Sequence, residues 1–172
     1  MNFRLTEHTI LALVTELQDV LKDIPDEQFC SRHPRRQLSC SEIYCHVIQV
    51  NKRCLLALER CIYGKQQFGR RNSPLLSRLI LYLGHMAMQK ISIPEHLAAT
   101  ASNATREDIR NELISFSERL RGLMPRVLKC SPHQRIKHQK LGLLNCAEWL
   151  RFMEIYTYYH LRQLRKVREC FS

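Results

Sequence analysis

Four stretches of the chain repeat apolar residues every three or four positions, which is the spacing of one face of an α-helix. They cover about residues 6–22, 40–63, 106–127 and 146–170, and Pro25 closes the first. We therefore expect four amphipathic helices. The inward residues are Ile10, Leu13, Val14, Leu17 and Leu21; Ile43, Val47, Val50, Cys54, Leu58 and Cys61; Ile109, Leu113, Phe116, Leu120 and Leu123; and Trp149, Met153, Tyr156, His160, Leu164 and Val167.

Three of these stretches begin with a capping box. A short side-chain oxygen at the N-cap accepts an unpaired backbone N–H, and an acid three residues later reaches back. Glycine numbers only 5 of 172 residues, which is too few for the turns of a large sheet protein. The three pairs are Ser39 and Glu42, Thr105 and Asp108, and Asn145 and Glu148.

A long connection separates the second and third helices. It contains a basic loop at 64–73, an apolar segment at 74–89 that we expect to form a shorter helix, and an irregular part around Pro94. Residues 130–142, with His133 and His138, are expected to form another loop. The sequence thus predicts one all-α domain over residues 1–172, a four-helix bundle with a long crossover.

The net charge of the chain is +11 with histidine neutral. Residues 1–118 hold 15 basic and 13 acidic side chains, whereas residues 119–172 hold 12 basic and 3 acidic. Such a field attracts nucleic acid, anionic lipid or a small anionic ligand. Because no helix-turn-helix, zinc finger or similar module is present, we expect a small anionic substrate rather than nucleic acid.

Eight cysteines occur without any C-x-x-C pair, which disfavours a zinc ribbon or a thioredoxin motif. The first ten residues are polar and show no signal-peptide cleavage site. The longest apolar stretch, Leu75–Met88, is interrupted by Arg78 and His85 and is too short to span a bilayer. We therefore expect reduced cysteines in a cytoplasmic protein that does not enter a membrane.

Two histidines interrupt the apolar stripes. His46 follows Ile43 by three residues, and His160 lies four residues after Tyr156 and four before Leu164. Two inward imidazoles from different helices can converge in a bundle core, where neutral imidazole binds Zn, Ni or Fe. Tyr156 would place a phenolic oxygen near both. The alternative is two satisfied core histidines and a packed tyrosine, because a stable metal site normally needs three protein ligands.

Other catalytic signatures are absent, including the phosphate-binding, dinucleotide-binding, H-E-x-x-H and G-x-S-x-G motifs. Cys45 and His46 are adjacent, so their side chains point about 100° apart on a helix and cannot form a dyad. Cys146 begins the last helix, where the dipole would lower the pKa of a thiol. A helix-end cysteine without a role is the simpler interpretation.

Leu141–Val167 reads LGLLNCAEWLRFMEIYTYYHLRQLRKV, a loop with glycine followed by a capped helix carrying E-W-L-R-F and L-R-Q. This segment resembles the C-terminal signature of the DinB-like (YfiT-like) family. Ser39–Asn51, a capped helix with a histidine two turns in, and Ile93–Leu97, with its proline, resemble further parts of the same family. The resemblance covers nearly the whole chain and is most specific in the last helix.

The resemblance implies a four-helix bundle that holds a divalent metal by one histidine of the second helix and two of the last. His46 matches the first of these and His160 the third, while Tyr156 stands in the middle position. Characterised relatives are thiol-dependent transferases and isomerases. The resemblance therefore implies a metal site at His46, Tyr156 and His160 and a low-molecular-weight thiol as cofactor, with Arg151 and Arg162 favouring an anionic thiol.

Three classes of function follow from these observations. The first is a metal-dependent thiol transferase or hydrolase-like enzyme, which needs the three-residue site to bind metal. The second is a non-catalytic binding or stress-associated bundle, for which the tyrosine at position 156 is the main support. The third, nucleic-acid binding, is disfavoured because basic residues along one helix usually form a solvated face. A homodimer is left open.

Overall fold

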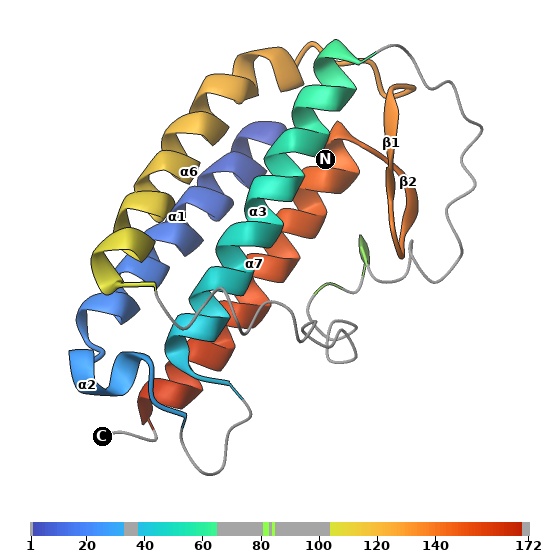
Figure 1. Cartoon of the computed structure of the whole chain (residues 1–172). Coiled ribbons are helices and arrows are strands. Elements are labelled where there is room, and N and C mark those ends of the chain that lie inside the picture. The colour runs from blue at the N-terminus through green and yellow to red at the C-terminus, as the bar shows by residue number, and fades with distance from the viewer. Residues whose placement is uncertain (1, 33–37, 65–80, 83, 85–103, 170–172) are drawn as a thin grey trace.

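Four long helices form the body of the described part of the molecule (Figure 1). The computed structural model describes residues 2–32, 38–64, 81–82, 84 and 104–169. These residues are all-α apart from one small hairpin. Its elements are α1 (Phe3–Lys22), α2 (Asp26–Phe29), α3 (Cys40–Tyr63), α6 (Arg106–Val127), β1 (Arg135–His138), β2 (Gly142–Asn145) and α7 (Cys146–Glu169).

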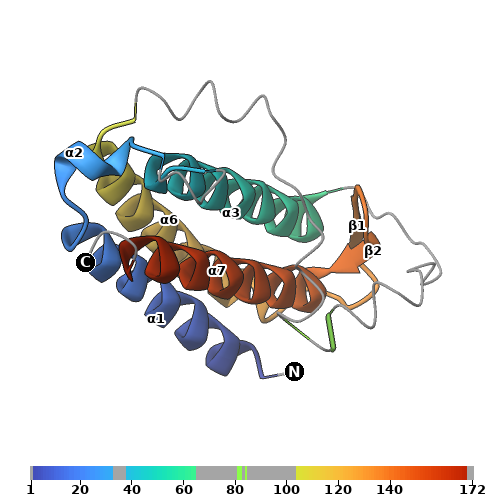
Figure 2. The ribbon, with the colours of Figure 1, turned by 90° about the horizontal axis from the view of Figure 1, so that it is seen from below.

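The helices pack in the order α1, α7, α3, α6, with α6 closing the ring against α1 (Figure 2). α3 and α6 run in the same direction (Figure 1). The end of α3 and the start of α6 therefore lie at opposite ends of the bundle, and the connection between them lies almost wholly outside the described residues. The short helix expected within residues 74–89 lies outside the described residues, except for positions 81, 82 and 84.

All three capping boxes are present, and each begins a helix as predicted. In every case the N-cap side chain accepts the backbone N–H of the acidic residue, and that carboxylate accepts the N-cap N–H. The two distances are 3.2 and 2.7 Å for Ser39 with Glu42, 3.1 and 3.0 Å for Thr105 with Asp108, and 3.0 and 3.0 Å for Asn145 with Glu148.

The predicted apolar stripes form the core. Every residue assigned to them is buried except Val50, which is half-buried against the same cluster. Tyr44 is not among the predicted stripe residues, yet it is fully buried. Its hydroxyl explains how a polar side chain is tolerated there, because it donates a hydrogen bond to the Leu17 carbonyl over 2.8 Å.

Replacing Tyr44 with phenylalanine should lower the free energy of unfolding by about 1–2 kcal/mol, because the Leu17 carbonyl would lose its side-chain donor inside the core. Urea unfolding of the two proteins measures the difference. Tyr63→Phe is the matched control, since Tyr63 is 63 % exposed and should change stability by less than about 0.5 kcal/mol. Equal losses in both variants would contradict the assignment.

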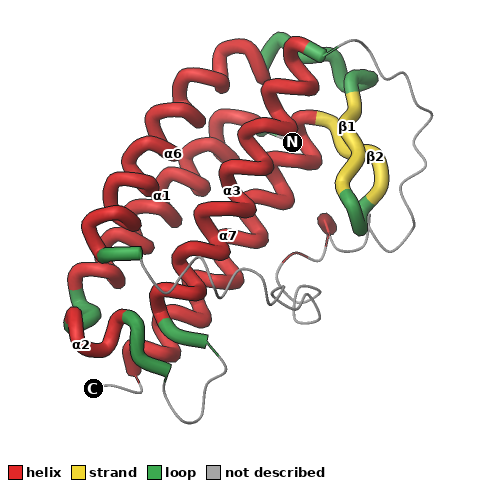
Figure 3. Tube along the Cα trace, viewed as in Figure 1, coloured by secondary structure: helices red, strands yellow, loops and turns green. Residues whose placement is uncertain are grey.

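The expectation of a loop at 130–142 is wrong in its second half. β1 and β2 form an antiparallel hairpin in which Arg135 pairs with Asn145 and His138 pairs with Gly142 (Figure 3). Gly142 has φ +77°, a conformation that only glycine adopts readily, and it lets the chain turn into β2. The four-residue strands are too short and too polar to show a clear alternation. The one-turn helix α2 was also not predicted.

Candidate functional site

Three side chains from two helices meet in the core. His46 comes from the second turn of α3, while Tyr156 and His160 lie one turn apart on α7. They are 4, 2 and 2 % exposed. Their ring centroids are 5.6 Å apart for His46 and Tyr156, 5.2 Å for the two histidines, and 4.5 Å for Tyr156 and His160. We call these three residues the core triad; the structure brings together all three residues that the sequence singled out.

The Tyr156 hydroxyl is hydrogen-bonded to Nε2 of His46. Burial raises the pKa of Tyr156 above its usual value, so the residue remains a neutral phenol and can donate to this nitrogen. Nδ1 of His46 is buried and has no hydrogen-bond partner among the described residues. Because Nε2 accepts from Tyr156, Nδ1 of the neutral imidazole carries the proton, so it could donate to a water but could not bind a metal ion. An unpartnered buried polar group of this kind costs about 1–3 kcal/mol.

His160 is held by a network on its own helix. Its Nδ1 lies 2.7 Å from Oε1 of Gln163, and the amide of Gln163 donates to the Tyr159 hydroxyl over 3.0 Å. An amide oxygen only accepts, so Nδ1 of His160 carries the proton and Nε2 carries the lone pair. Metal-ligating histidines are typically oriented in this way by a partner on the second nitrogen.

Both imidazoles are neutral at pH 7. Burial lowers the pKa of His46 to about 4, with a further contribution from the charge of Arg53. Burial and the neighbouring His46 lower the pKa of His160 to about 3. Neutral imidazole is the form that binds a metal ion.

The register of α3 against α7 is set next to the core triad by a second polar pair. Asn51 and Thr157 are buried, and they exchange hydrogen bonds of 3.1 and 3.3 Å between the amide and the hydroxyl. A shift of either helix would leave both groups unpaired in the core. This pair therefore holds His46 opposite Tyr156.

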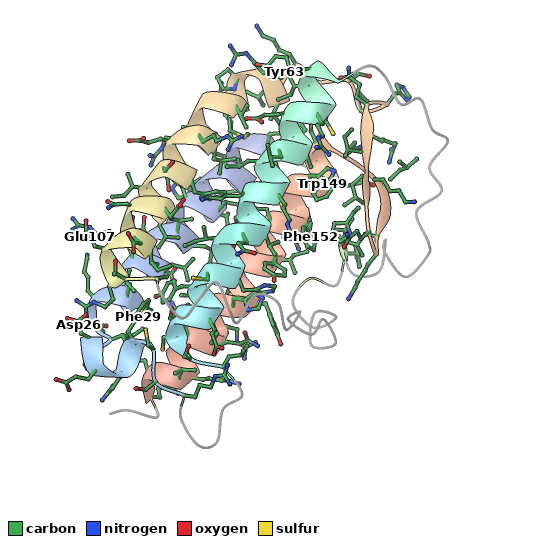
Figure 4. The ribbon with its side chains drawn as sticks, in the orientation of Figure 1. Asp26, Phe29, Tyr63, Glu107, Trp149 and Phe152 are labelled. Atoms are coloured by element: carbon green, nitrogen blue, oxygen red, sulfur yellow. The ribbon has the colours of Figure 1, made fainter. Side chains whose placement is uncertain are left out.

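The hairpin closes one end of the site. The His138 ring packs against Trp149 and Phe152, with centroids 5.2 and 4.8 Å apart, and Phe152 continues to Tyr156 at 5.5 Å. Figure 4 shows Trp149 and Phe152 on the side of α7 that faces the hairpin. Nδ1 of His138 accepts the backbone N–H groups of residues 140 and 141 at 3.1 Å each. His138 thus shapes the turn and helps to cover the core triad.

The two arginines expected near the site lie elsewhere. Arg151 donates to Glu154 over 2.8 Å and to the Leu81 carbonyl over 3.3 Å, and it lines a hollow of about 390 Å³ that faces α1. Arg162 is exposed, and two residues from His160 place it on the opposite side of α7. The structure therefore does not bring Arg151 and Arg162 to the core triad.

Among the described residues, Arg53 is a cation whose charge reaches the site, and it was missed in the sequence. It is exposed, and its charge acts on His46 and on Tyr156. The signal was available, because Arg53 follows His46 by seven residues and so lies on the same face of α3 two turns away. Gln163 could have been found similarly, three residues after His160.

Much of the positive charge in the last third of the chain is paired. Ion pairs with N···O distances of 2.8–3.0 Å join Arg135 to Glu148 and Arg168 to Asp23, and Arg165 is also paired with Glu16. Both Asp23 and Glu16 belong to the α1 region. Acidic side chains near the start of the sequence therefore neutralise part of the basic surplus near its end. The field that an anion meets is thus weaker than the local count of charges indicates.

Among the described residues, no group of three His, Cys, Asp or Glu side chains could hold a metal ion. A metal at the core triad would therefore take two imidazoles and the Tyr156 oxygen. Two nitrogens on one zinc lie within about 4 Å of each other, since each bond is about 2 Å, and imidazole centroids 5.2 Å apart permit this. The hydrogen bond from Tyr156 occupies Nε2 of His46, so these three residues would fit a metal only after that hydrogen bond opens, and the phenol would be the weakest ligand.

Comparison with known proteins gives no match to this chain. No family model, no curated protein and no solved structure matches it. Within the part of the chain that the structure describes, no helix is long and apolar enough to cross a membrane.

Proposed function

We propose that the protein is a DinB-like metalloenzyme that transfers a small thiol to an electrophile. The observation that supports this is the core triad, in which two neutral imidazoles and a phenol from α3 and α7 share one buried spot. A divalent Zn, Ni or Fe ion there would stabilise a thiolate and lower the pKa of the bound thiol.

Each side chain has a distinct part in this proposal. His160 offers Nε2 because Gln163 holds the proton on Nδ1. His46 offers one nitrogen once its hydrogen bond with Tyr156 opens. Tyr156 serves as the third ligand or donates a hydrogen bond to the thiol. Arg53 attracts an anionic thiol, which is the part first expected of Arg151 and Arg162.

Elemental analysis after metal reconstitution tests the proposal. Wild-type protein should retain close to one divalent ion per chain after gel filtration, and His46→Ala should retain less than a tenth of that amount, because one imidazole remains. His8→Ala is the control, since His8 is exposed on α1. Thiol-transfer rates to an aryl halide, measured on the same samples, should follow metal content. Equal metal content in wild type and His46→Ala would rule the proposal out.

One observation favours a second candidate, a non-catalytic binding or stress-associated bundle that has lost its metal. The hydrogen bond between Tyr156 and His46 already occupies the nitrogen that a metal would need. In that case wild-type protein retains no metal after reconstitution. His46→Phe would then be no less stable than wild type, because it removes the unpartnered Nδ1 from the core.

A further inference from the structure

Three cysteines meet at the end of the bundle where the hairpin joins it. Cys61 lies in the last turn of α3, Cys130 follows α6, and Cys146 is the first residue of α7. We call them the thiol cluster. Tyr156 is ten residues beyond Cys146, or about 15 Å along α7, so the cluster is separate from the core triad. All seven described cysteines are free thiols.

The contacts within the thiol cluster centre on Cys146. Its thiol interacts with the thiols of both Cys61 and Cys130, and this interaction lowers the pKa of Cys61 and raises that of Cys146. The Cys130 sulfur lies 3.4 Å from the Cys61 carbonyl and 3.0 Å from the Gln134 side-chain oxygen. Two cysteines whose thiols interact can form a disulfide when side-chain rotation brings their Cβ atoms to about 4 Å.

Access distinguishes the three thiols. Cys61 is 1 % and Cys146 is 4 % exposed, whereas Cys130 is partly exposed. A small oxidant therefore reaches Cys130 first. Burial raises the pKa of Cys130, so only a small fraction is thiolate at pH 7 and the reaction is slow.

We propose that the thiol cluster is an oxidation site at which a hydroperoxide converts Cys130 and Cys146 into a disulfide. The Cys130 thiolate attacks one peroxide oxygen, the O–O bond breaks, and Cys130 becomes a sulfenic acid while one water leaves. The Cys146 sulfur then attacks the Cys130 sulfur, the S–O bond breaks, and hydroxide leaves and takes up the Cys146 proton as a second water. In total, two thiols and one H2O2 give one disulfide and two waters.

The disulfide would close a ring around the hairpin, because β1 and β2 lie between residues 130 and 146. The hairpin carries His138, which packs over the aromatic side chains at the end of the core triad. Oxidation would thus restrain the element that covers the proposed site. A cross-link over a loop of this length should raise the Tm by about 5 °C or more.

Peptide mapping of the whole reduced chain tests the proposal. The protein is treated with millimolar H2O2 and EDTA, blocked with N-ethylmaleimide and digested with trypsin without reduction. Peptide 130–135 should be found linked to peptide 141–151, and dithiothreitol should separate them. Thiols titrated in denaturant should fall by two per chain.

Two variants sharpen the result. In Cys146→Ser the linked peptides should disappear, and Cys130 should be oxidised further to sulfinic acid. Cys130→Ser, a change at a partly exposed position, should abolish the link as well. Cys54→Ser is the control, because Cys54 is as buried as Cys61 but lies outside the thiol cluster. In this variant the link between Cys130 and Cys146 should persist. Absence of the link in oxidised wild type, or a link from Cys146 to peptide 61–65 instead, would overturn the proposal.

Discussion

Replacing Tyr156 with histidine is expected to tighten zinc binding at the core triad on the order of 100-fold, because the change completes a set of three imidazole ligands. The loss of a partner outside the ligand set already changes metal affinity about 10–100-fold, so the gain of a ligand should have at least a comparable effect. The position suits the change. The Tyr156 side chain is buried, its ring centroid lies 4.5 Å from that of His160, and its hydroxyl contacts His46. A new imidazole at this position would therefore point at both histidines. Competition with a chromogenic chelator at pH 7.5 measures the affinity.

Tyr156→Phe is the matched control for this prediction. It keeps the ring and removes the oxygen, so it should bind zinc more weakly than wild type if the phenol is a ligand. Wild type and Tyr156→Phe without measurable zinc, together with tight binding by Tyr156→His, would favour the non-catalytic candidate whose site has been lost. Equal affinities of the His and Phe variants would contradict a metal site at the core triad altogether.

Lowering the pH from 7 to 5 is expected to destabilise the metal-free protein by several kcal/mol. The pKa values of His46 and His138 are lowered to about 4 and that of His160 to about 3, chiefly by burial. An unfolded histidine has a pKa of about 6.5, so the unfolded chain binds more protons below that pH. Stability is therefore complete above about pH 7 and falls as the pH drops from 6.5 towards 4, by roughly 1–2 kcal/mol for each histidine.

Urea unfolding in EDTA at several pH values measures this slope. His138→Asn should make the slope shallower, because the asparagine oxygen can accept the same two backbone N–H groups but does not titrate in this range. His8→Gln, a change at an exposed position, should leave the slope unchanged. A stability that is constant from pH 7 to pH 5 would contradict the neutral state of the buried His46 and His160 and the half-buried His138.

The candidate site was predictable in its members but not in its chemistry. Helical spacing placed His46, Tyr156 and His160 inward, and the structure brings all three together. Helical spacing did not predict that Tyr156 would occupy Nε2 of His46 or that Gln163 would orient His160. These contacts depend on the register between helices and on side-chain rotamers.

Long-range charge and cysteine placement were the least predictable features. Residues 119–172 carry a large basic surplus, but folding pairs Arg165 and Arg168 with acids of the α1 region, more than 140 residues away in the sequence. Cys61, Cys130 and Cys146 share no motif spacing, and only the meeting of three helix ends brings them together. Neither the long-range ion pairs nor the thiol cluster can be predicted from the residues near one another in the sequence.

The sequence by itself determined the four long helices, the starts of the three that carry capping boxes, and their inward faces, since apolar period and capping are local properties of the chain. The hairpin, the pairing of α3 with α7 by Asn51 and Thr157, and the thiol cluster were decided only by the tertiary structure. The physical reason is that each of these depends on contacts between residues far apart in sequence, whose free energy is realised only after the helices have packed.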